Sequence, residues 1–546
     1  MQARAARLWL FGGTLALLGG FCVSAPAQVA LPTAPAMTSA SDVARVIEQG
    51  TLLEQQRRWA EALSHYEQAL RLHPGAPDLT QRLAVARAHY DVARRYSDTS
   101  FVTTVGAMSE RDALGIYDEV LLKVHSHYVH EPQWKQMVRC GTTNVEVALS
   151  EPAFMQKHAP GLTTERQLQL ISSLKQWTEA ASVGDRTQAR DLVHRIAYTA
   201  QQHFGVSSQA VILEYVAGAA SSLDEYSGFL TGSQLGEVFS QIEGNFVGLG
   251  VELKTEESGL LIVNVIPAGP AAVGGIQVGQ RIIEVDGRTM GQISADAMAD
   301  LLRGIEGSQV RVTTRDQAGQ LQHLTLTRQR VEVPSVENIK LVDEAYGIGY
   351  FKLSSFQKTT ARDVDAALWK LHEQGMRTLI IDLRGNPGGL LKAAVDVADK
   401  FVNDGMIVAT RGRSPREDFD HKGQAAGTWR VPLVVLIDHD SASASEILAG
   451  AILDHRRGTV VGETSYGKGS VQGIFPLAAA ELGVRLTTAK WYTPSGKAIS
   501  GHGVEPEVKV RTAAKPVDAT LLAAAAQPDS MLNAALQVAR AQVSRR

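Results

Sequence analysis

The sequence predicts a multidomain protein with a helical N-terminal region, a β-rich middle domain and an α/β C-terminal core. Apolar residues recur at helical spacing up to about residue 240. From about residue 241 the apolar residues recur at every second position, and Gly or Pro residues separate these short strand-like runs. Beyond residue 345, continuous apolar runs alternate with helical patterns, which is typical of buried parallel strands. A chain of 546 residues is also too long for one hydrophobic core.

The first 27 residues predict a secretory signal peptide. Two arginines precede an apolar stretch over residues 8–23, and the small-residue sequence Ala25-Pro26-Ala27 follows it. The stretch is short for a membrane span, which needs about 20 apolar residues. We therefore expect an exported protein, located in the periplasm or cell envelope or secreted. Membrane association is expected only if the signal stays uncleaved.

Composition excludes several classes of partner and site. The 54 basic and 57 acidic residues nearly balance, so no nucleic-acid partner is predicted. Beyond residue 27 only Cys140 remains, which rules out an intramolecular disulfide and predicts a buried, small apolar side chain. No cysteine pair or HExxH motif occurs, so neither a metal nor a cofactor is predicted.

Residues 41–95 predict helices that match one tetratricopeptide repeat, a unit of about 34 residues. The match rests on Gly50, Leu53, Ala62, Tyr66, Ala69 and Pro74. One repeat cannot bury its own face, so residues 77–95 are expected to form a capping helix. A generic helical hairpin is the alternative. These helices are a candidate surface for a protein partner, and residues 107–240 continue as a helical region.

Residues 241–330 predict a small β domain. A helix is expected over residues 295–302, and strands are expected over residues 260–266, 281–285, 309–314 and 322–328. This order resembles a PDZ domain. The resemblance implies that a loop captures the C-terminal carboxylate of a substrate through backbone N–H groups. The loop residues would be Phe246, Val247, Gly248, Leu249 and Gly250.

Residues 331–512 predict the α/β core. The apolar runs 346–353 and 378–383 flank a helical pattern, which indicates a right-handed βαβ unit. A further buried strand is expected over residues 431–437. Residues 513–546 form a C-terminal tail with one helix near residues 531–543.

Ser443 is the first candidate for chemistry. It lies between the strand 431–437 and a predicted helix over residues 445–454, where a helix N-terminus offers N–H groups to a developing oxyanion. Its small neighbours, Ala442 and Ala444, leave room for a substrate backbone. A serine hydroxyl needs a neighbouring base to become a good nucleophile.

Lys468 is the candidate base. Glycines flank it on both sides and let the chain bend so that the amine turns inward, and a buried lysine loses its proton more readily than an exposed one. Gln472 follows four positions later and suits the role of orienting the amine. The segment 382–389 follows another buried strand and exposes backbone N–H groups, as an oxyanion hole requires. Together these loops predict a serine hydrolase.

The chain resembles the C-terminal processing peptidases, also called tail-specific proteases, of the S41 serine peptidase family. The matching segments are residues 382–389, 441–450, 467–472, 486–489 and 492–496, and the resemblance covers about residues 215–510. It implies an α/β core of the crotonase/ClpP-like type. It also implies an endopeptidase that recognises protein C-termini through the PDZ domain and cleaves near them through an acyl-enzyme.

The resemblance also assigns roles to single residues. Ser443, rather than Ser441 or Ser445, would be the nucleophile. Lys468 would be the general base, and Gln472 would orient it.

The oxyanion hole would combine the backbone N–H of Ala444 with that of Gly388 or Gly389. The chain departs from the family at Asp438 and Asp440, where asparagine and glycine are usual. A carboxylate near the lysine would favour its protonated form, and both side chains are expected to point to solvent instead.

Three other interpretations remain. His439 beside Asp440 suggests a Ser-His-Asp triad, but His439 is too close to Ser443 along the chain to reach it freely. The chain is alternatively a non-catalytic PDZ and repeat-helix adaptor on an inactive peptidase core. A related core with a different hydrolytic activity is the third.

Overall fold

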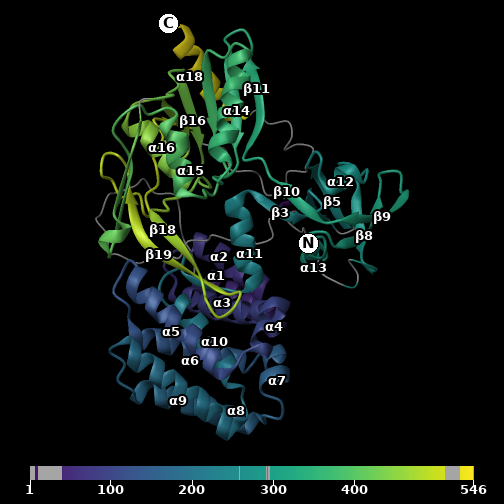
Figure 1. Ribbon diagram of the computed structural model, residues 1–546, viewed down its shortest axis with the longest axis vertical. Helices are drawn as coiled ribbons and strands as arrows, with labels where there is room; N and C mark the ends of the chain where they lie inside the picture. Colours follow the sequence, from purple (N-terminus) through teal and green to yellow (C-terminus); the bar gives the residue numbers. More distant parts are fainter. Residues whose placement is uncertain are drawn as a thin grey trace. The chain divides into compact units, whose positions relative to one another are not determined.

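The computed structural model describes residues 7–9, 40–256, 259–289, 292, 295–424, 426–510 and 529–544. The chain divides into two compact units (Figure 1). The helical unit comprises residues 15–235 and 472–488, and the sheet unit comprises residues 1–14, 236–471 and 489–546. Each unit is described by itself.

The helical unit is built from ten described helices. They are α1 (Ala40–Gln55), α2 (Trp59–Leu72), α3 (Pro77–Ser97), α4 (Thr99–Ala107), α5 (Glu110–His127), α6 (Trp134–Ala148), α7 (Pro152–His158), α8 (Thr164–Ala180), α9 (Arg186–Phe204) and α10 (Ser208–Ser221). Almost every residue of α10 is buried, because its sequence is apolar on all sides. Glycines bring α6 and α10 together: a Cβ at Gly218 would lie 2.5 Å from the Cα of Gly141.

The helices predicted for residues 41–95 are present as α1, α2 and α3, and α1 and α2 pack together as a hairpin. Gly50 allows the close approach within this hairpin, because a Cβ there would lie 2.3 Å from the ring of Tyr66. The hairpin has its own small core around Ala62, Tyr66 and Leu79. The tetratricopeptide assignment itself stays a prediction.

The sheet unit begins with the predicted β domain. Its elements are β3 (Asn245–Gly248), β4 (Val251–Glu256), β5 (Gly259–Val265), α12 (Pro270–Val273), β6 (Arg281–Val285), β7 (Arg288–Thr289), α13 (Ala295–Leu301), β8 (Gln309–Arg315), β9 (Leu321–Thr327) and β10 (Gln329–Glu332). The main sheet has the order β1 (Arg7–Trp9), β4, β5, β6, β8 and β9, with β7 paired to β6, while β3 pairs with β10. The four strands and the helix predicted for this region are confirmed.

The α/β core has one six-stranded sheet. Its order is β11 (Val336–Asp343), β12 (Ile348–Leu353), β13 (Thr378–Asp382), β16 (Leu433–Ile437), β17 (Thr459–Gly462) and β20 (Val508–Lys509). All neighbours are parallel except β11 and β12. The predicted βαβ unit is confirmed as β12, α14 (Thr360–Glu373) and β13. The adjacent carboxyl ends of β13 and β16 carry the loops predicted to hold the site.

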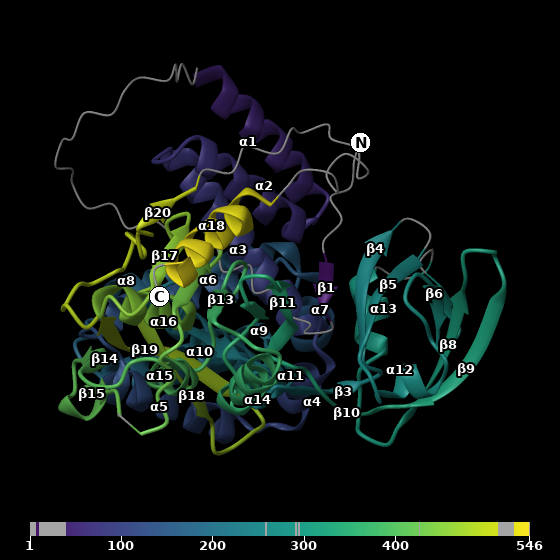
Figure 2. The ribbon, with the colours of Figure 1, turned by 90° about the horizontal axis from the view of Figure 1, so that it is seen from above.

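Helices cover both faces of this sheet. On one face α14, α15 (Leu391–Asp399) and α16 (Ala444–Asp454) share an apolar core with the strands. On the other face α18 (Ser530–Ser544) packs against β13, β16 and β17, and Figure 2 looks down on it. The helix expected near residues 531–543 is therefore present and belongs to the core.

A second sheet contains β14 (Met406–Gly412), β15 (Phe419–Lys422), β18 (Ser470–Pro476) and β19 (Gly483–Tyr492). A 3₁₀ turn, η1 (Pro415–Glu417), precedes β15. Within the sheet unit, β19 pairs with β14 through residues 489–492. Within the helical unit, β19 pairs through residues 483–485 with β2 (Gly228–Leu230), after which α11 (Gly232–Glu243) follows.

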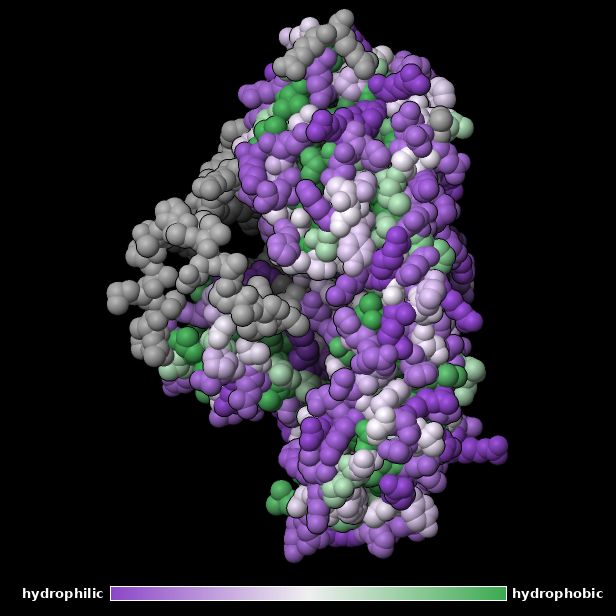
Figure 3. Space-filling view, turned by 90° about the vertical axis from the view of Figure 1, so that its left-hand side faces the viewer, coloured by the Kyte–Doolittle hydropathy of each residue, from purple (hydrophilic) through white to green (hydrophobic). Residues whose placement is uncertain are grey.

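Most of the signal peptide predicted for residues 1–27 lies outside the described residues. Only β1 (Arg7–Trp9) is described, paired antiparallel with β4. Among the described helices, none combines the length and the apolar character needed to cross a bilayer. On the face shown in Figure 3, hydrophobic residues form small scattered patches among hydrophilic ones.

Candidate functional site

The serine loop, residues 438–446, places Ser443 on a strained turn between β16 and α16. Ser443 has φ 54° and ψ −112°, and it is half-buried between buried neighbours. A non-glycine residue in such a conformation costs roughly 1–3 kcal/mol and persists only where its surroundings enforce it. Serine nucleophiles of other hydrolases occupy the same kind of sharp strand-to-helix turn, which exposes the hydroxyl oxygen. The predicted position of Ser443 at a strand-to-helix turn is confirmed.

Glu446 enforces this turn from inside the protein. Its side chain is fully buried, and its Oε2 accepts hydrogen bonds from the backbone N–H of Ser443 at 2.7 Å and of Lys468 at 2.9 Å. Its Oε1 accepts from the N–H of Gly467 and from the hydroxyl of Ser465, both at 2.6 Å. One carboxylate therefore fixes the main chain of both candidate catalytic residues.

Burial raises the pKa of the Glu446 carboxyl group, and the four hydrogen bonds it accepts act in the opposite direction. A buried carboxylate is stable only when its oxygens are well supplied with donors. The four donors come from two separate segments, so the glutamate joins these segments as well as satisfying its own charge.

Lys468 is held by its main chain on both sides. While its N–H donates to Glu446, its carbonyl oxygen accepts from the indole Nε1 of the buried Trp491 at 3.0 Å. Gly467 has φ 91°, and a Cβ there would lie about 3 Å from three backbone nitrogens of residues 501–503. The bend predicted at the glycines is present, and the lysine side chain is half-buried.

The glycine loop, residues 382–389, lies directly beside the serine loop. A Cβ at Gly388 would lie 2.8 Å from the Cβ of Ser443 and 2.9 Å from the backbone nitrogen of Ala444. The carbonyl oxygen of Asn386 accepts from the N–H of Ala442 and the hydroxyl of Ser445, both at 3.0 Å. The structure thus brings together the two loops that the sequence selected.

Hydrogen bonding distinguishes the two candidate glycines. The N–H of Gly388 donates to Asn386 Oδ1 at 2.8 Å, and the Gly388 carbonyl accepts from Phe356 N–H at 2.9 Å. Among the described residues, neither Gly389 N–H nor Ala444 N–H donates to a protein acceptor. Because C=O and N–H point in opposite directions across a trans peptide, the Gly389 N–H points away from Phe356. Gly389 and Ala444 are the available donors.

An ion pair holds the start of the glycine loop. Asp382 is 2% exposed; its two oxygens share a bifurcated hydrogen bond from Arg384 Nε, at 3.0 and 3.1 Å, and accept one from Nη2 at 2.6 Å. The hydroxyl of Tyr350 adds a bond to Asp382 at 2.9 Å. The two carboxylates beside Arg384, Asp382 and Asp529, raise the pKa of its guanidinium although burial acts against them. Arg384 therefore stays charged.

The structure corrects the expectation that both aspartates of the serine loop point to solvent. Asp438 is half-buried, and its Oδ1 accepts from the N–H groups of Gly385 and Asp440 and from the hydroxyl of Ser441, at 3.0–3.1 Å. It joins the two loops because its acceptor oxygen reaches donors in both. Asp440 is exposed as expected, and His439 is 74% exposed beside Asp440 and Glu463.

Gln472 belongs to the helical unit and begins a polar chain there. Its Nε2 donates to Thr487 Oγ1 at 3.4 Å, and Thr487 Oγ1 donates to Asp224 Oδ1 at 3.1 Å. Asp224 also accepts the N–H groups of Tyr226 and Ser227, both at 2.8 Å. The side chain predicted to orient the lysine is thus itself anchored, and its role toward Lys468 stays a prediction.

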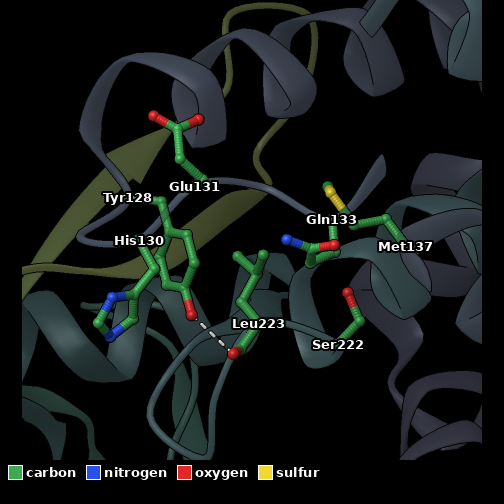
Figure 4. Close-up of a pocket in the computed structure, with 7 residues that line it drawn as sticks. All are labelled: Tyr128, His130, Glu131, Gln133, Met137, Ser222 and Leu223. Atoms are coloured by element: carbon green, nitrogen blue, oxygen red, sulfur yellow. Dashed lines mark hydrogen bonds between the residues drawn. The ribbon is translucent and has the colours of Figure 1, made fainter. Parts of the chain in front are cut away.

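The helical unit also contains a pocket of about 240 Å³, which Figure 4 shows. Its lining residues are Tyr128, His130, Glu131, Gln133, Met137, Ser222 and Leu223. The hydroxyl of Tyr128 donates to the Leu223 carbonyl at 2.6 Å, and the N–H of Val129 donates to the Thr487 carbonyl at 2.9 Å. A backbone hydrogen bond therefore connects the segment that lines the pocket with Thr487, the partner of Gln472.

The predicted PDZ loop is divided between a strand and a turn. Phe246, Val247 and Gly248 lie in β3 and pair with β10, and Phe246 is buried in the core of the domain. Leu249 is also buried, and Gly250, with φ 78°, turns the chain into β4. Carboxylate capture by this loop stays a prediction, with Gly250 at its bend.

Sequence reasoning missed three structural supports of the site. Glu446 had a usable signal, because a serine followed three residues later by glutamate before an apolar run is the pattern of a capping box. Asp382 and Arg384 lay inside a segment selected only for its glycines. Their ion pair had no sequence signal, and neither did the bond to Asp382 from Tyr350 of another strand.

Comparisons with known proteins identify the families of two regions of the chain. The model of peptidase family S41 matches residues 347–510, and a PDZ domain model matches residues 261–316. The carboxy-terminal-processing protease of Bartonella bacilliformis is 38% identical over 310 residues, which span 55% of this chain and 70% of that protein. The carboxyl-terminal-processing protease of Synechocystis is 37% identical, over 53% of this chain and 68% of that protein.

Two further matches have lower coverage or similarity. The carboxy-terminal processing protease CtpA of Bacillus subtilis is 31% identical, over 54% of this chain and 62% of that protein. A solved structure, the photosystem II D1 C-terminal processing protease, is 26% identical with a TM-score of 0.37, over 73% of this chain and 93% of that one. The relatives from Bartonella bacilliformis, Synechocystis and Bacillus subtilis are named proteases, which does not favour a non-catalytic adaptor. The chain belongs to peptidase family S41 and is a serine peptidase of the carboxy-terminal-processing group that carries a PDZ domain.

Proposed function

We propose that the protein is an exported endopeptidase that recognises exposed protein C-termini and cleaves near them with a Ser443–Lys468 dyad. The observation that carries the dyad is the shared carboxylate. Glu446 Oε2 accepts the backbone N–H of both residues, at 2.7 and 2.9 Å. A buried acceptor that serves both segments holds nucleophile and base in one fixed relation.

In the acylation step, neutral Lys468 Nζ accepts the hydroxyl proton while Ser443 Oγ forms a bond to the scissile carbonyl carbon. The carbonyl oxygen becomes an oxyanion. Lys468 then gives the proton to the departing amine nitrogen, the C–N bond breaks, and the acyl group stays on Ser443. Gln472 is proposed to orient the lysine amine, as the family resemblance implies.

In the deacylation step, Lys468 takes a proton from a water molecule that attacks the acyl carbon. A second oxyanion forms and collapses, and the proton returns to Ser443 Oγ as the acid product leaves. The same two side chains therefore serve both halves of the reaction, and the chemistry needs no cofactor.

The oxyanion is proposed to bind the N–H groups of Gly389 and Ala444. Both donors lack a protein acceptor within the described part of the chain, whereas Gly388 N–H is already bonded to Asn386. Ala444 is the first residue of α16, so its N–H also carries the positive end of the helix dipole. Removing one such donor typically slows catalysis about 100-fold to 1000-fold.

Recognition of C-termini is proposed to use the edge of β4. This edge pairs with an extended segment, β1, in the antiparallel sense, with Trp9 opposite Glu252 and Arg7 opposite Lys254. A peptide added in this register runs with its C-terminus toward Gly250, where the predicted carboxylate loop turns. Main-chain pairing gives affinity, and the loop supplies the preference for a free carboxylate.

Export is part of the proposal and rests on the order of charged, apolar and small residues in the first 27 positions. The N-terminal residue of the protein recovered from the cell envelope would test it. A protein that retains its initiator methionine would contradict cleavage.

The central experiment replaces each member of the dyad. Ser443→Ala and Lys468→Ala are both expected to lower peptide cleavage by at least 1000-fold, because nucleophile and base act as a unit. Lys490→Ala, an exposed lysine on β19, serves as the matched control and should leave turnover unchanged. A fluorophosphonate probe should label the unmodified chain and fail to label Ser443→Ala.

Binding is measured on the same variants. A fluorescent peptide with a free C-terminus should bind Ser443→Ala as well as it binds the unmodified chain, and its C-terminal amide should bind more weakly. Cleavage that survives in Ser443→Ala would refute the dyad. Equal binding of acid and amide would refute carboxylate recognition while leaving the dyad intact.

A further inference from the structure

The C-terminal helix α18 is attached to the glycine loop through one residue. Asp529 immediately precedes α18, and its Oδ1 accepts from Arg384 Nη1 at 2.8 Å and from the N–H of Leu532 at 2.9 Å. It therefore caps the helix and contacts an arginine of the loop with the same oxygen. Asp529 is 145 residues away from Arg384 along the chain.

Arg384 distributes its nitrogens between two carboxylates. Nε and Nη2 bond to Asp382 inside the protein, while Nη1 bonds to Asp529 at the surface. The guanidinium is planar and rigid, so partners on two sides fix both its position and its rotation. With Asp382 as its only partner, the guanidinium of Arg384 would be held along one edge and free to move at the other.

The loop that starts at Arg384 ends at the oxyanion donor. Gly385 N–H is bonded to Asp438, Asn386 is bonded to the serine loop, and Gly389 follows three residues later. A displacement of Arg384 also displaces the backbone of Gly389, because the residues between them are held firmly by hydrogen bonds. Misplacement of a reacting group by about 1 Å can cost roughly 100-fold in rate, so a smaller shift still matters.

We propose that Asp529 is a positioning residue of the peptidase site, which acts through Arg384 to set the glycine loop and its Gly389 N–H. The proposal rests on the oxyanion hole described above. It gives α18 a role in catalysis in addition to covering the sheet. The apolar contacts of Met531, Ala535 and Ala539 dock the helix, and Asp529 connects the docked helix to the loop.

The chain offers variants that separate positioning from stability. Asp529→Ser keeps a good helix cap but is too short to reach Arg384. Asp529→Asn keeps both the cap and an acceptor oxygen for Arg384. Arg540→Ala removes the other ion pair of the same helix, Arg540 Nε to Asp343 Oδ2 at 2.7 Å, far along α18 from the loop.

The test measures kcat and KM on one peptide with the full chain. Asp529→Ser is expected to lower kcat about tenfold with little change in KM, because a transition-state donor is displaced rather than a substrate contact. Asp529→Asn should recover at least a third of the original kcat. Arg540→Ala should keep kcat and KM unchanged, and the rate of fluorophosphonate labelling should follow kcat across the series.

Two results would overturn the proposal. One is a kcat for Asp529→Ser within threefold of the unmodified chain. The other is an equal loss in Arg540→Ala, which would reduce the role of Asp529 to helix docking. Failure of the dyad itself is distinguishable, because it would appear as cleavage that persists in Ser443→Ala whatever residue 529 is.

Discussion

The serine loop and the glycine loop face each other across the proposed oxyanion hole, but they are held in opposite ways. The serine loop is fixed from inside by Glu446, whose side chain is fully buried and accepts four hydrogen bonds. The glycine loop is fixed from Asp382 outward through Arg384 to Asp529, whose side chain is 43% exposed. One anchor is surrounded by protein, and the other ends in solvent.

This difference in burial predicts how much each anchor loses when its side chain is replaced. Removing a buried acceptor leaves several donors without a partner, and each costs about 1–3 kcal/mol. When an exposed partner is removed, water replaces the lost hydrogen bond, so the loss of free energy is smaller. The strained φ of Ser443 needs the first kind of anchor, because strain persists only where the surroundings enforce it.

The largest effect in this comparison is expected at Glu446. Glu446→Ala should lower kcat by at least about 100-fold, because four donors lose their acceptor and the two dyad segments separate. Peptide cleavage and fluorophosphonate labelling both measure this. The matched control is Asp454→Ala at the other end of α16, which loses the bond from the Ser495 N–H at 2.9 Å and the bonds from the hydroxyls of Thr493 and Ser495.

The contrast between the buried anchor, Glu446, and the partly exposed anchor, Asp529, also predicts which variant loses more activity. Glu446→Ala should be more damaging than Asp529→Ser by tenfold or more in kcat. Equal losses would mean that exposure does not separate the two anchors. Thermal melting of both variants would show whether an unfolded fraction explains any loss.

His158, in the helical unit, is a third case of a buried group that belongs to neither loop. It is 4% exposed in the helical unit, against the rings of Tyr96 and Phe154, and burial lowers its pKa to about 4. The unfolded chain binds the proton at about pH 6.5, so stability is present above that pH and is lost as the pH falls toward 4. In His158→Leu, the free energy of unfolding should therefore fall by roughly 2 kcal/mol less on acidification than in the unmodified chain.

Urea unfolding at pH 7 and pH 4.5, followed by tryptophan fluorescence, measures this difference between His158→Leu and the unmodified chain. At pH 7 the variant should retain its kcat, because His158 is buried in the core of the helical unit and belongs to neither loop of the proposed active site. An identical pH dependence of the free energy of unfolding in the two proteins would contradict the prediction.

The smallest effect is expected at Asp438, which touches both loops. All three of its hydrogen bonds end on Oδ1, so Asp438→Asn keeps the acceptor and removes only the charge. The kcat should change less than threefold, while Asp438→Ala should lose more because Gly385 and Ser441 lose their acceptor. A rise in kcat for the asparagine variant at neutral pH would show instead that the aspartate weakens the lysine base.

Local chemistry made several parts of the molecule predictable. The strands of the β domain follow from alternating residues and glycine turns, and the strand before Ser443 follows from an uninterrupted apolar run. The loops around Ser443, Lys468 and Gly388 were also predictable from local chemistry, because glycine, alanine and serine after a buried strand indicate an exposed turn. The expectation for Asp438 was wrong because a charged residue at a strand end has no sequence signal for the donors that meet it.

Patterns along the chain were sufficient to predict the order of the domains, the family and the loops that hold the candidate nucleophile and base. Which groups hold these loops in place depends on how the chain folds. Glu446 becomes an anchor only where two segments meet, and Asp529 contacts Arg384 only because α18 docks on the far face of the sheet. Short-range patterns encode turns and strands, whereas hydrogen bonds between residues distant in sequence exist only after the chain has folded.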